Sequence, residues 1–248
     1  AAMLDNGTAL PAMLFPDVPT YYRDFTPHNY NRTFDGAVPA DRVVERSLNV
    51  PSVRMLDKYG KENFLALVRA LGFGTIDRSA AHYGLSLILG GAEISLWDLT
   101  SAYMKLAAKL NGRQTIRTPH YDPGGGTAVD AGDIPLSRGA IWLMANSISH
   151  VARPEEEGEW QYFSSSKKIG WKTGTSYGNR DAWAVGMTPD YAVGGRAAAD
   201  DGRGVCRACP VRGLRPAAQR GVVRGARRRP GTRRGLPTER LPGFAYLS

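Results

Sequence analysis

The order of the helical and strand patterns along the chain constrains its fold more than any other feature of the sequence. Helical periodicity is confined to the residues before 151, whereas short apolar runs separated by Gly, Asn or Thr-Pro come after residue 168. This segregation predicts an α+β fold, an antiparallel sheet packed with helices, and not a doubly wound parallel sheet. The expected helices are 40–46, 52–59, 61–71, 95–110 and 137–150 with the end of another at 1–7, the expected strands are 169–176, 182–186 and 191–194, and 11–39 is expected to be an extended loop.

Charge divides the chain at residue 195. Residues 196–248 contain thirteen arginines, no lysine and three acids, a net charge of +10, so the rest of the chain carries −1 of the total of +9. The tail is rich in Arg, Gly, Ala and Pro and lacks hydrophobic periodicity, which is typical of disorder. We therefore expect a partial domain over 1–195 and a disordered tail over 196–248, the product of a frameshift near Gly194 or Gly195 in a GC-rich gene.

The alternative for this tail is a basic arm that binds nucleic acid or anionic lipid. No aromatic residues interleave with the arginines, which weakens base stacking. We therefore expect no nucleic-acid partner.

The sequence indicates neither a metal site nor a cofactor site. Cys206 and Cys209 form a single C-x-x-C with no second pair and no nearby histidine, and the histidines have no ligand spacing. No dinucleotide-binding or P-loop glycine motif occurs. We expect no metal and no cofactor. No run reaches the roughly 18 apolar residues of a membrane-spanning helix and no signal-peptide pattern opens the chain, so we also expect no targeting or anchoring segment in it.

A lysine followed by three small residues is the first candidate site. If 169–176 is a strand with a free edge, its backbone can pair with an extended peptide, and Gly174 lets that peptide approach closely. Lys172 and the hydroxyls of Thr173 and Thr175 would then bind a carboxylate through charge-assisted hydrogen bonds. The alternative is a lysine on a solvated strand face beside turn-forming residues.

The second candidate site is the junction of two expected helices. Pro51 disfavours helix at the preceding residue and fits the first turn of the next helix, which would leave Ser47 and Asn49 on a short connection. A hydroxyl and an amide there can relay a proton and hold a substrate amide. The alternative is ordinary helix capping by the asparagine.

The two motifs in this order, S-x-N and then K-T-G, occur together in penicillin-binding proteins and serine β-lactamases. Over about residues 1–194 the chain resembles the transpeptidase domain of the bifunctional penicillin-binding proteins, particularly those of type 1C. The resemblance implies the penicillin-binding protein and serine β-lactamase-like transpeptidase fold, which we expect to be incomplete at both ends of this chain. The segments that carry it are DNG, LFPDVPTYYRDFTPHNYNRTFDGAV, SLNVPSVRMLDKYG, LSLILGGAEISLWDLTSAY and WKTGTSYGNRDAWAVG.

The resemblance implies serine acyl transfer. A serine attacks the D-Ala-D-Ala bond of a peptidoglycan stem peptide, D-alanine leaves, and an amine of a neighbouring stem resolves the acyl-enzyme; β-lactams mimic the dipeptide and trap the serine. Ser47 would pass a proton toward the leaving amine, Asn49 would occupy the other S-x-N position, and Lys172 with its threonines would bind the terminal carboxylate. In the intact family protein this occurs at the periplasmic face of the inner membrane, and membrane attachment needs a segment absent from this chain.

One departure from the family concerns the nucleophile. Its S-x-x-K motif lies upstream of the segment that AAMLDNG matches, so we expect this chain to lack the serine and not to acylate alone. The strings at Ser164–Lys167 and Ser165–Lys168 follow S-x-N and read as a loop, not as the nucleophile. Two alternatives stay open: a non-catalytic module that binds stem peptides, and a basic nucleic-acid binder.

Two further expectations concern side chains outside these motifs. An ion pair between Arg180 and Asp181 is expected to shape the edge of the site. The large helical side chains expected to pack in the core are Trp97, Tyr103, Met104 and Trp142.

Overall fold

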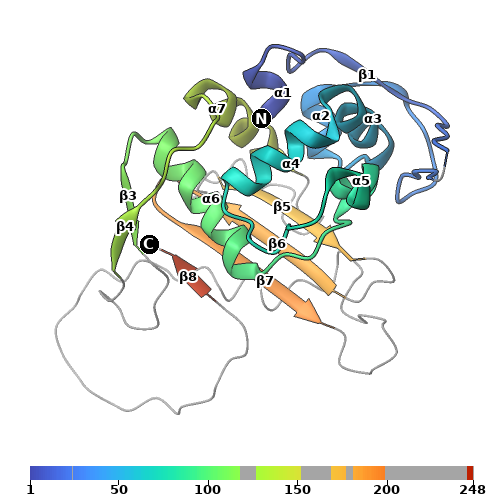
Figure 1. The fold of residues 1–248 in the computed structure, drawn as a ribbon. Helices are drawn as coiled ribbons and strands as arrows, with labels where there is room; N and C mark the ends of the chain where they lie inside the picture. The colour runs from blue at the N-terminus through green and yellow to red at the C-terminus, as the bar shows by residue number, and fades with distance from the viewer. Residues whose placement is uncertain (24, 118–126, 152–168, 177–180, 199–244, 248) are drawn as a thin grey trace, which may run out of the picture.

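The fold is described by a computed structural model of the whole chain, in which residues 1–23, 25–117, 127–151, 169–176, 181–198 and 245–247 are placed well enough to describe (Figure 1). The helices come first and the main sheet last, as predicted. The helices are α1 (Ala2–Asp5), α2 (Ala40–Glu45), α3 (Asn49–Tyr59), α4 (Lys61–Ala70), α5 (Ala80–Tyr83), the 3-10 helix η1 (Gly84–Leu89), α6 (Leu96–Leu110) and α7 (Arg138–Ser149). The strands are β1 (Leu14–Asp17), β2 (Gly36–Pro39), β3 (Thr115–Arg117), β4 (Ala128–Asp130), β5 (Gly170–Thr175), β6 (Asp181–Met187), β7 (Ala192–Ala198) and β8 (Ala245–Leu247).

The main sheet has the order β5-β6-β7-β8, and every neighbouring pair of strands is antiparallel. Helix α6 crosses β6 and β7 on one face, and α7 packs against β5 (Figure 1). A Cβ added at Gly170 would meet Ile148 of α7, and one added at Gly194 would meet Thr100 of α6. These close approaches show which face of the sheet receives the helices, and the predicted α+β architecture is confirmed.

Most of the predicted helices begin and end within a few residues of the predicted positions. Ser95 and Ser137 accept hydrogen bonds from the backbone N–H groups of Asp98 and Ala140, which caps α6 and α7. Three clusters of buried apolar side chains hold the layers together. The first fills the space between α6, α7 and the sheet, and its fully buried Ile141 lies on α7.

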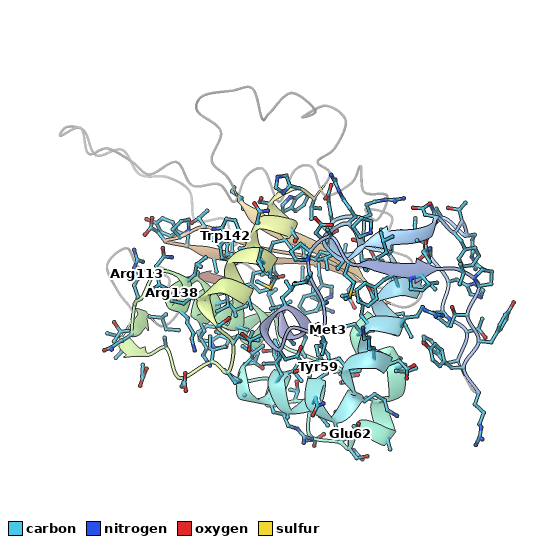
Figure 2. All side chains as sticks on the ribbon, turned by 90° about the horizontal axis from the view of Figure 1, so that it is seen from above. Met3, Tyr59, Glu62, Arg113, Arg138 and Trp142 are labelled. Carbon is cyan, nitrogen blue, oxygen red and sulfur yellow. The ribbon has the colours of Figure 1, made fainter. Side chains whose placement is uncertain are left out.

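Parts of the expected long loop and core differ from prediction. The stretch 11–39 contains a two-stranded hairpin, β1 with β2, because Phe15 and Asp17 point inward on alternate positions. Trp97 and Trp142 do not pack in the core: they are 49% and 56% exposed, and Trp142 lies on the outer side of α7 (Figure 2). Met104 is buried as predicted, and burial raises the pKa of Tyr103 to about 12.

The expected domain boundary at residue 195 falls inside one strand. Strand β7 continues from Gly194 to Ala198 and stays paired with β6 throughout, while β8 pairs with β7 from the far end of the chain. Most of the tail, including Cys206 and Cys209, lies outside the described residues, as do both S-x-x-K strings. Among the helices that are described, none has both the length and the apolar character needed to cross a bilayer.

Candidate active site

Ser47 follows Arg46, the C-cap residue of α2, and has a left-handed backbone conformation, with φ +55°. Two hydrogen bonds end the helix at this point. The Ser47 N–H donates to the carbonyl of Val44 at 3.2 Å, and the N–H of Leu48 donates to the carbonyl of Val43 at 3.0 Å. Val43 and Leu48 are both buried in one apolar cluster. Together these contacts form a Schellman motif, in which glycine is the usual residue at the left-handed position. The motif turns the chain so that the Ser47 hydroxyl is exposed while Leu48 is buried.

The left-handed conformation of Ser47 leads to a prediction about stability. Because a Cβ costs about 1 kcal/mol or more in this region, the Ser47→Gly variant should be more stable than Ser47→Ala by about 1 kcal/mol. Both variants lack the hydroxyl, so the comparison isolates the backbone effect. Urea unfolding of the two variants measures the difference.

The matched control for this prediction is Ala66, an exposed residue in the middle of α4. There, replacing alanine by glycine should destabilise the protein by about 1 kcal/mol, the opposite sign. A glycine at residue 47 that is no more stable than alanine would show that the left-handed conformation is not retained in solution.

Asn49 is the first residue of α3, not part of the connection as predicted, because the helix begins three residues earlier than expected. Its side-chain amide donates to the carbonyl of His28 at 2.9 Å. The next backbone N–H, that of Val50, donates to the side-chain oxygen of Asn29 at 3.1 Å. Pro51 lies in the first turn of the helix, where the prediction placed it.

Lys172 of β5 meets Ser47 across the interface between the sheet and the helices. Its ammonium donates to the Ser47 hydroxyl at 2.5 Å and to the carbonyl of Thr173 at 2.7 Å. An ammonium has three donors, so within the described chain one N–H remains for a ligand. Burial lowers the pKa of Lys172 from its ordinary value of 10.5. The structure thus brings the two candidate motifs, 125 positions apart, into direct contact.

The side chains of the K-T-G motif in β5 lie on both faces of the sheet. Gly170, Lys172 and Gly174 share the face of the sheet that receives α7. The side chains of Thr173 and Thr175 therefore lie on the opposite face. A Cβ added at Gly174 would have no neighbour within 4 Å, so this part of the face is open.

The backbone groups of the two threonines face the free edge of the sheet. The N–H of Ser176 bonds to the carbonyl of Asp181 in continuation of the ladder, and bonded residues alternate along an antiparallel strand. Gly174 and Lys172 therefore pair with β6. The N–H and C=O groups of Thr173 and Thr175 point away from it, where an added peptide strand can bond to them.

Arg196, Asp181 and Trp183 form a group near Gly174 that was not expected from the sequence. Trp183 is the register partner of both Gly174 and Arg196, and the Arg196 guanidinium lies 5.7 Å from the Trp183 ring centre. Asp181 accepts two hydrogen bonds from Arg196, at 2.6 and 2.9 Å. Within the described chain the cation paired with Asp181 is therefore Arg196, while Arg180, the expected partner, lies outside the described residues. Arg196 was missed because it stands in the sequence that reads as tail.

The described residues hold no group of three or more His, Cys, Asp or Glu side chains placed to bind a metal ion. What the site contains is a half-buried ammonium, an exposed hydroxyl, an amide at a helix start and a free strand edge. This set of groups can bind a carboxylate, transfer a proton and hold an extended peptide.

An α+β domain in which a K-T-G strand contacts an S-x-N junction defines the class that contains the penicillin-binding proteins and the serine β-lactamases. The sequence model of one family, the penicillin binding protein transpeptidase domain, matches residues 1–194. The chain belongs to the penicillin-binding protein transpeptidase domain family.

Individual relatives agree with this assignment. Penicillin-binding protein 1C of Escherichia coli K12 is 35% identical over 192 residues, which cover 77% of this chain and 24% of the relative. Penicillin-binding protein 1F of Bacillus subtilis 168 is 30% identical over 192 residues, or 72% of this chain and 26% of the relative. The chain therefore spans about a quarter of the length of these relatives.

Solved structures show the same fold. The penicillin-binding protein PonA1 of Mycobacterium tuberculosis, in its complex with penicillin V, superposes with a TM-score of 0.57 at 19% identity. That superposition covers 79% of this chain and 57% of the PonA1 chain. The likeness to the bifunctional penicillin-binding proteins of type 1C, expected from the sequence, is confirmed by these comparisons.

Proposed function

We propose that this domain binds the D-Ala-D-Ala end of peptidoglycan stem peptides along the free edge of β5, as part of a serine transpeptidase. The observation that carries the proposal is the contact between the Lys172 ammonium and the Ser47 hydroxyl. It joins a cation suited to a terminal carboxylate with a hydroxyl suited to proton transfer. The alternative is a lysine on a solvated strand face. Such a lysine would not be expected to contact a serine in a strained conformation from another layer of the fold.

The proposed roles follow from the position of each group. Lys172 binds the terminal carboxylate with its remaining N–H, and the backbone groups of Thr173 and Thr175 pair with the peptide. Gly174 leaves room for the ligand beside them. Ser47 contacts Lys172, and Asn49 follows two residues later at the start of α3; the proposed roles are a hydroxyl that carries a proton and an amide that holds the peptide.

In the intact protein, we propose that this site serves acyl transfer. A serine hydroxyl gives its proton to a basic side chain as its oxygen bonds to the carbonyl carbon of the D-Ala-D-Ala link, the C–N bond breaks, and Ser47 passes a proton to the departing amine of D-alanine. The amine of a second stem peptide then displaces the serine. No metal or cofactor takes part in this proposal: the Ser47 hydroxyl transfers the proton and the Lys172 ammonium binds the carboxylate.

Partners and location are proposed on the same basis. β-Lactams, which resemble the D-Ala-D-Ala end, are the expected covalent inhibitors of the intact protein, and the PonA1 relative was solved in complex with penicillin V. We propose action at the periplasmic face of the inner membrane, where peptidoglycan is cross-linked. No nucleic-acid partner is proposed.

Peptide binding by the 248-residue chain tests the proposal. An acylated L-Lys-D-Ala-D-Ala peptide should bind, and the same peptide with a C-terminal amide should bind at least about tenfold more weakly, because a charge-assisted hydrogen bond is lost. Isothermal titration calorimetry measures both affinities. Equal affinities, or no detectable binding of either peptide, would count against the proposal.

A further inference from the structure

Asp17 and Asn29 are buried polar residues of the β1–β2 region, with 0% and 3% of their surfaces exposed. Asp17 is the last residue of β1, where its side chain points inward two positions after Phe15. A buried carboxylate is costly unless hydrogen bonds stabilise it. Such a residue needs an explanation that the apolar core does not provide.

Hydrogen bonds from a single loop satisfy the Asp17 carboxylate. One oxygen accepts from the side-chain amide of Asn29 at 2.8 Å, and the other accepts from the backbone N–H of Asp35 at 3.0 Å. Within the described chain no cation forms an ion pair with Asp17. The carboxylate therefore fixes the loop through its hydrogen bonds with the Asn29 amide and the backbone N–H of Asp35.

These contacts fix the orientation of the Asn29 amide. Its NH₂ group donates both to Asp17 and to the carbonyl of Thr33, at 2.9 Å in the second case. Both neighbours on that side are acceptors, so the Asn29 oxygen must face the other way, where it accepts from the N–H of Val50. Reversing the amide would place donor against donor at Val50.

Val50 belongs to the first turn of α3, whose N-cap residue, Leu48, supplies no side-chain cap. Helices α6 and α7 are capped by the adjacent serines, whereas α3 takes its cap from a residue 21 positions away. The neighbour of that residue, His28, accepts a hydrogen bond from the amide of Asn49. The loop that Asp17 orders thus holds the start of the helix that carries the S-x-N junction.

We infer that Asp17 is a positioning residue for the candidate active site: its buried carboxylate orients Asn29, which caps α3 at Val50, three residues after the Ser47 that contacts Lys172. Asp17 touches neither the ligand edge of β5 nor the Lys172 ammonium, so it acts through Asn29. This inference rests on the proposed function only where it concerns peptide affinity. The capping of α3 by Asn29 is testable without any ligand.

The first test is the Asp17→Asn variant, which keeps the shape and replaces one of the two acceptor oxygens by an NH₂ donor. The single amide oxygen of this asparagine cannot accept from both the Asn29 amide and the N–H of Asp35, so the loop should hold Asn29 less firmly, and hydrogen exchange of the Val50 N–H should become at least about tenfold faster. The NMR signal of the Lys172 side chain should shift, and affinity for the acylated L-Lys-D-Ala-D-Ala peptide should fall about tenfold. Unchanged Val50 exchange would overturn the inference.

The second variant exchanges the two residues, as Asp17→Asn with Asn29→Asp. An asparagine at 17 then donates to an aspartate at 29, whose second oxygen still accepts from Val50 and whose charge suits a helix N-terminus, while the hydrogen bond to the Thr33 carbonyl is lost. Val50 protection, the Lys172 signal and peptide affinity should recover in part, to values between those of Asp17→Asn and the parent chain. If Asp17→Asn alone does not fold, recovery of folding and Val50 protection in the exchanged variant supports the inference. Failure of both variants to protect Val50 overturns it.

The control is Ile76→Val, which removes one methylene in a different apolar cluster. It should lower overall stability by about 0.5–1.5 kcal/mol and leave the Lys172 signal and the peptide affinity unchanged. If it weakens peptide binding as much as Asp17→Asn does, Asp17 has a general structural role and the inference is wrong. If the parent chain binds no peptide, the proposed function fails, and Val50 exchange with the Lys172 signal still decides whether Asp17 positions the junction.

Discussion

Replacing Lys172 by methionine is expected to weaken binding of the acylated L-Lys-D-Ala-D-Ala peptide roughly tenfold to hundredfold, while the protein stays folded. A hydrogen bond between a charged donor and a carboxylate contributes about 1.5–3 kcal/mol, and the half-buried position of Lys172 limits competition from water. Calorimetric titration of the variant measures the loss. With the C-terminal amide peptide the variant should lose little further affinity, since that ligand has no carboxylate to recognise.

The matched control is Lys58→Met. Lys58 is exposed at the end of α3, where its ammonium lies 3.4 Å from the carbonyl of Thr8. Removing this charge lowers the net charge of the chain by the same amount and should leave peptide affinity unchanged. If both variants weaken binding equally, the effect is general electrostatic attraction, and Lys172 is not the carboxylate-binding group.

The pH dependence of binding gives the same prediction a second readout. Burial disfavours the charged form of Lys172 and lowers its pKa, so the ammonium is lost at lower pH than in an exposed lysine. Peptide affinity should therefore fall as pH rises through this lowered pKa. Stability has the opposite trend: between the lowered pKa and 10.5 the unfolded chain binds more protons, so the parent chain gains stability relative to Lys172→Met as pH rises.

Replacing Gly194 by alanine is expected to destabilise the protein by roughly 1–3 kcal/mol, the typical cost of overpacking. The added Cβ would lie 2.1 Å from the Thr100 hydroxyl and 3.0 Å from a methyl group of Leu96. Thr100 is fully buried and donates to the carbonyl of Leu96 at 2.6 Å, so it has no space to retreat. Helix α6 would have to move away from β7, and a lower midpoint in urea unfolding would report this.

Two variants make the Gly194 prediction specific. Gly174→Ala, on the same face of the sheet but with no atom within 4 Å of the new Cβ, should leave stability nearly unchanged. Thr100→Ala combined with Gly194→Ala removes the clashing hydroxyl and should recover part of the lost stability. If Gly194→Ala is as stable as the parent chain, α6 does not pack on the sheet as closely as described.

The main features of the fold and site were predictable because they have local signals in the sequence. The strand that bears Lys172 and the helices capped by Ser95 and Ser137 follow from periodicity and capping residues. Contact between the S-x-N and K-T-G motifs was expected from the function that they share, not from any spacing, and the structure brings the motifs together.

Other features depend on contacts between distant residues and have no local signal. Asp17 reads as a polar loop residue, and only its hydrogen bonds to Asn29 and Asp35 explain its burial. The left-handed position of Ser47 is hidden because glycine usually marks such a turn. Trp142 was assigned to the core by size alone, although its position on α7 faces outward.

The contact between Ser47 and Lys172 has a consequence for how ligands act on the folded chain. It joins two layers through residues that lie 125 positions apart in the sequence. A peptide bound to both residues would bridge those layers and would be released when they separate. At a concentration one hundred times its dissociation constant, such a ligand would raise the free energy of unfolding by about 2.7 kcal/mol, so occupancy of the site and durability of the fold are thermodynamically linked.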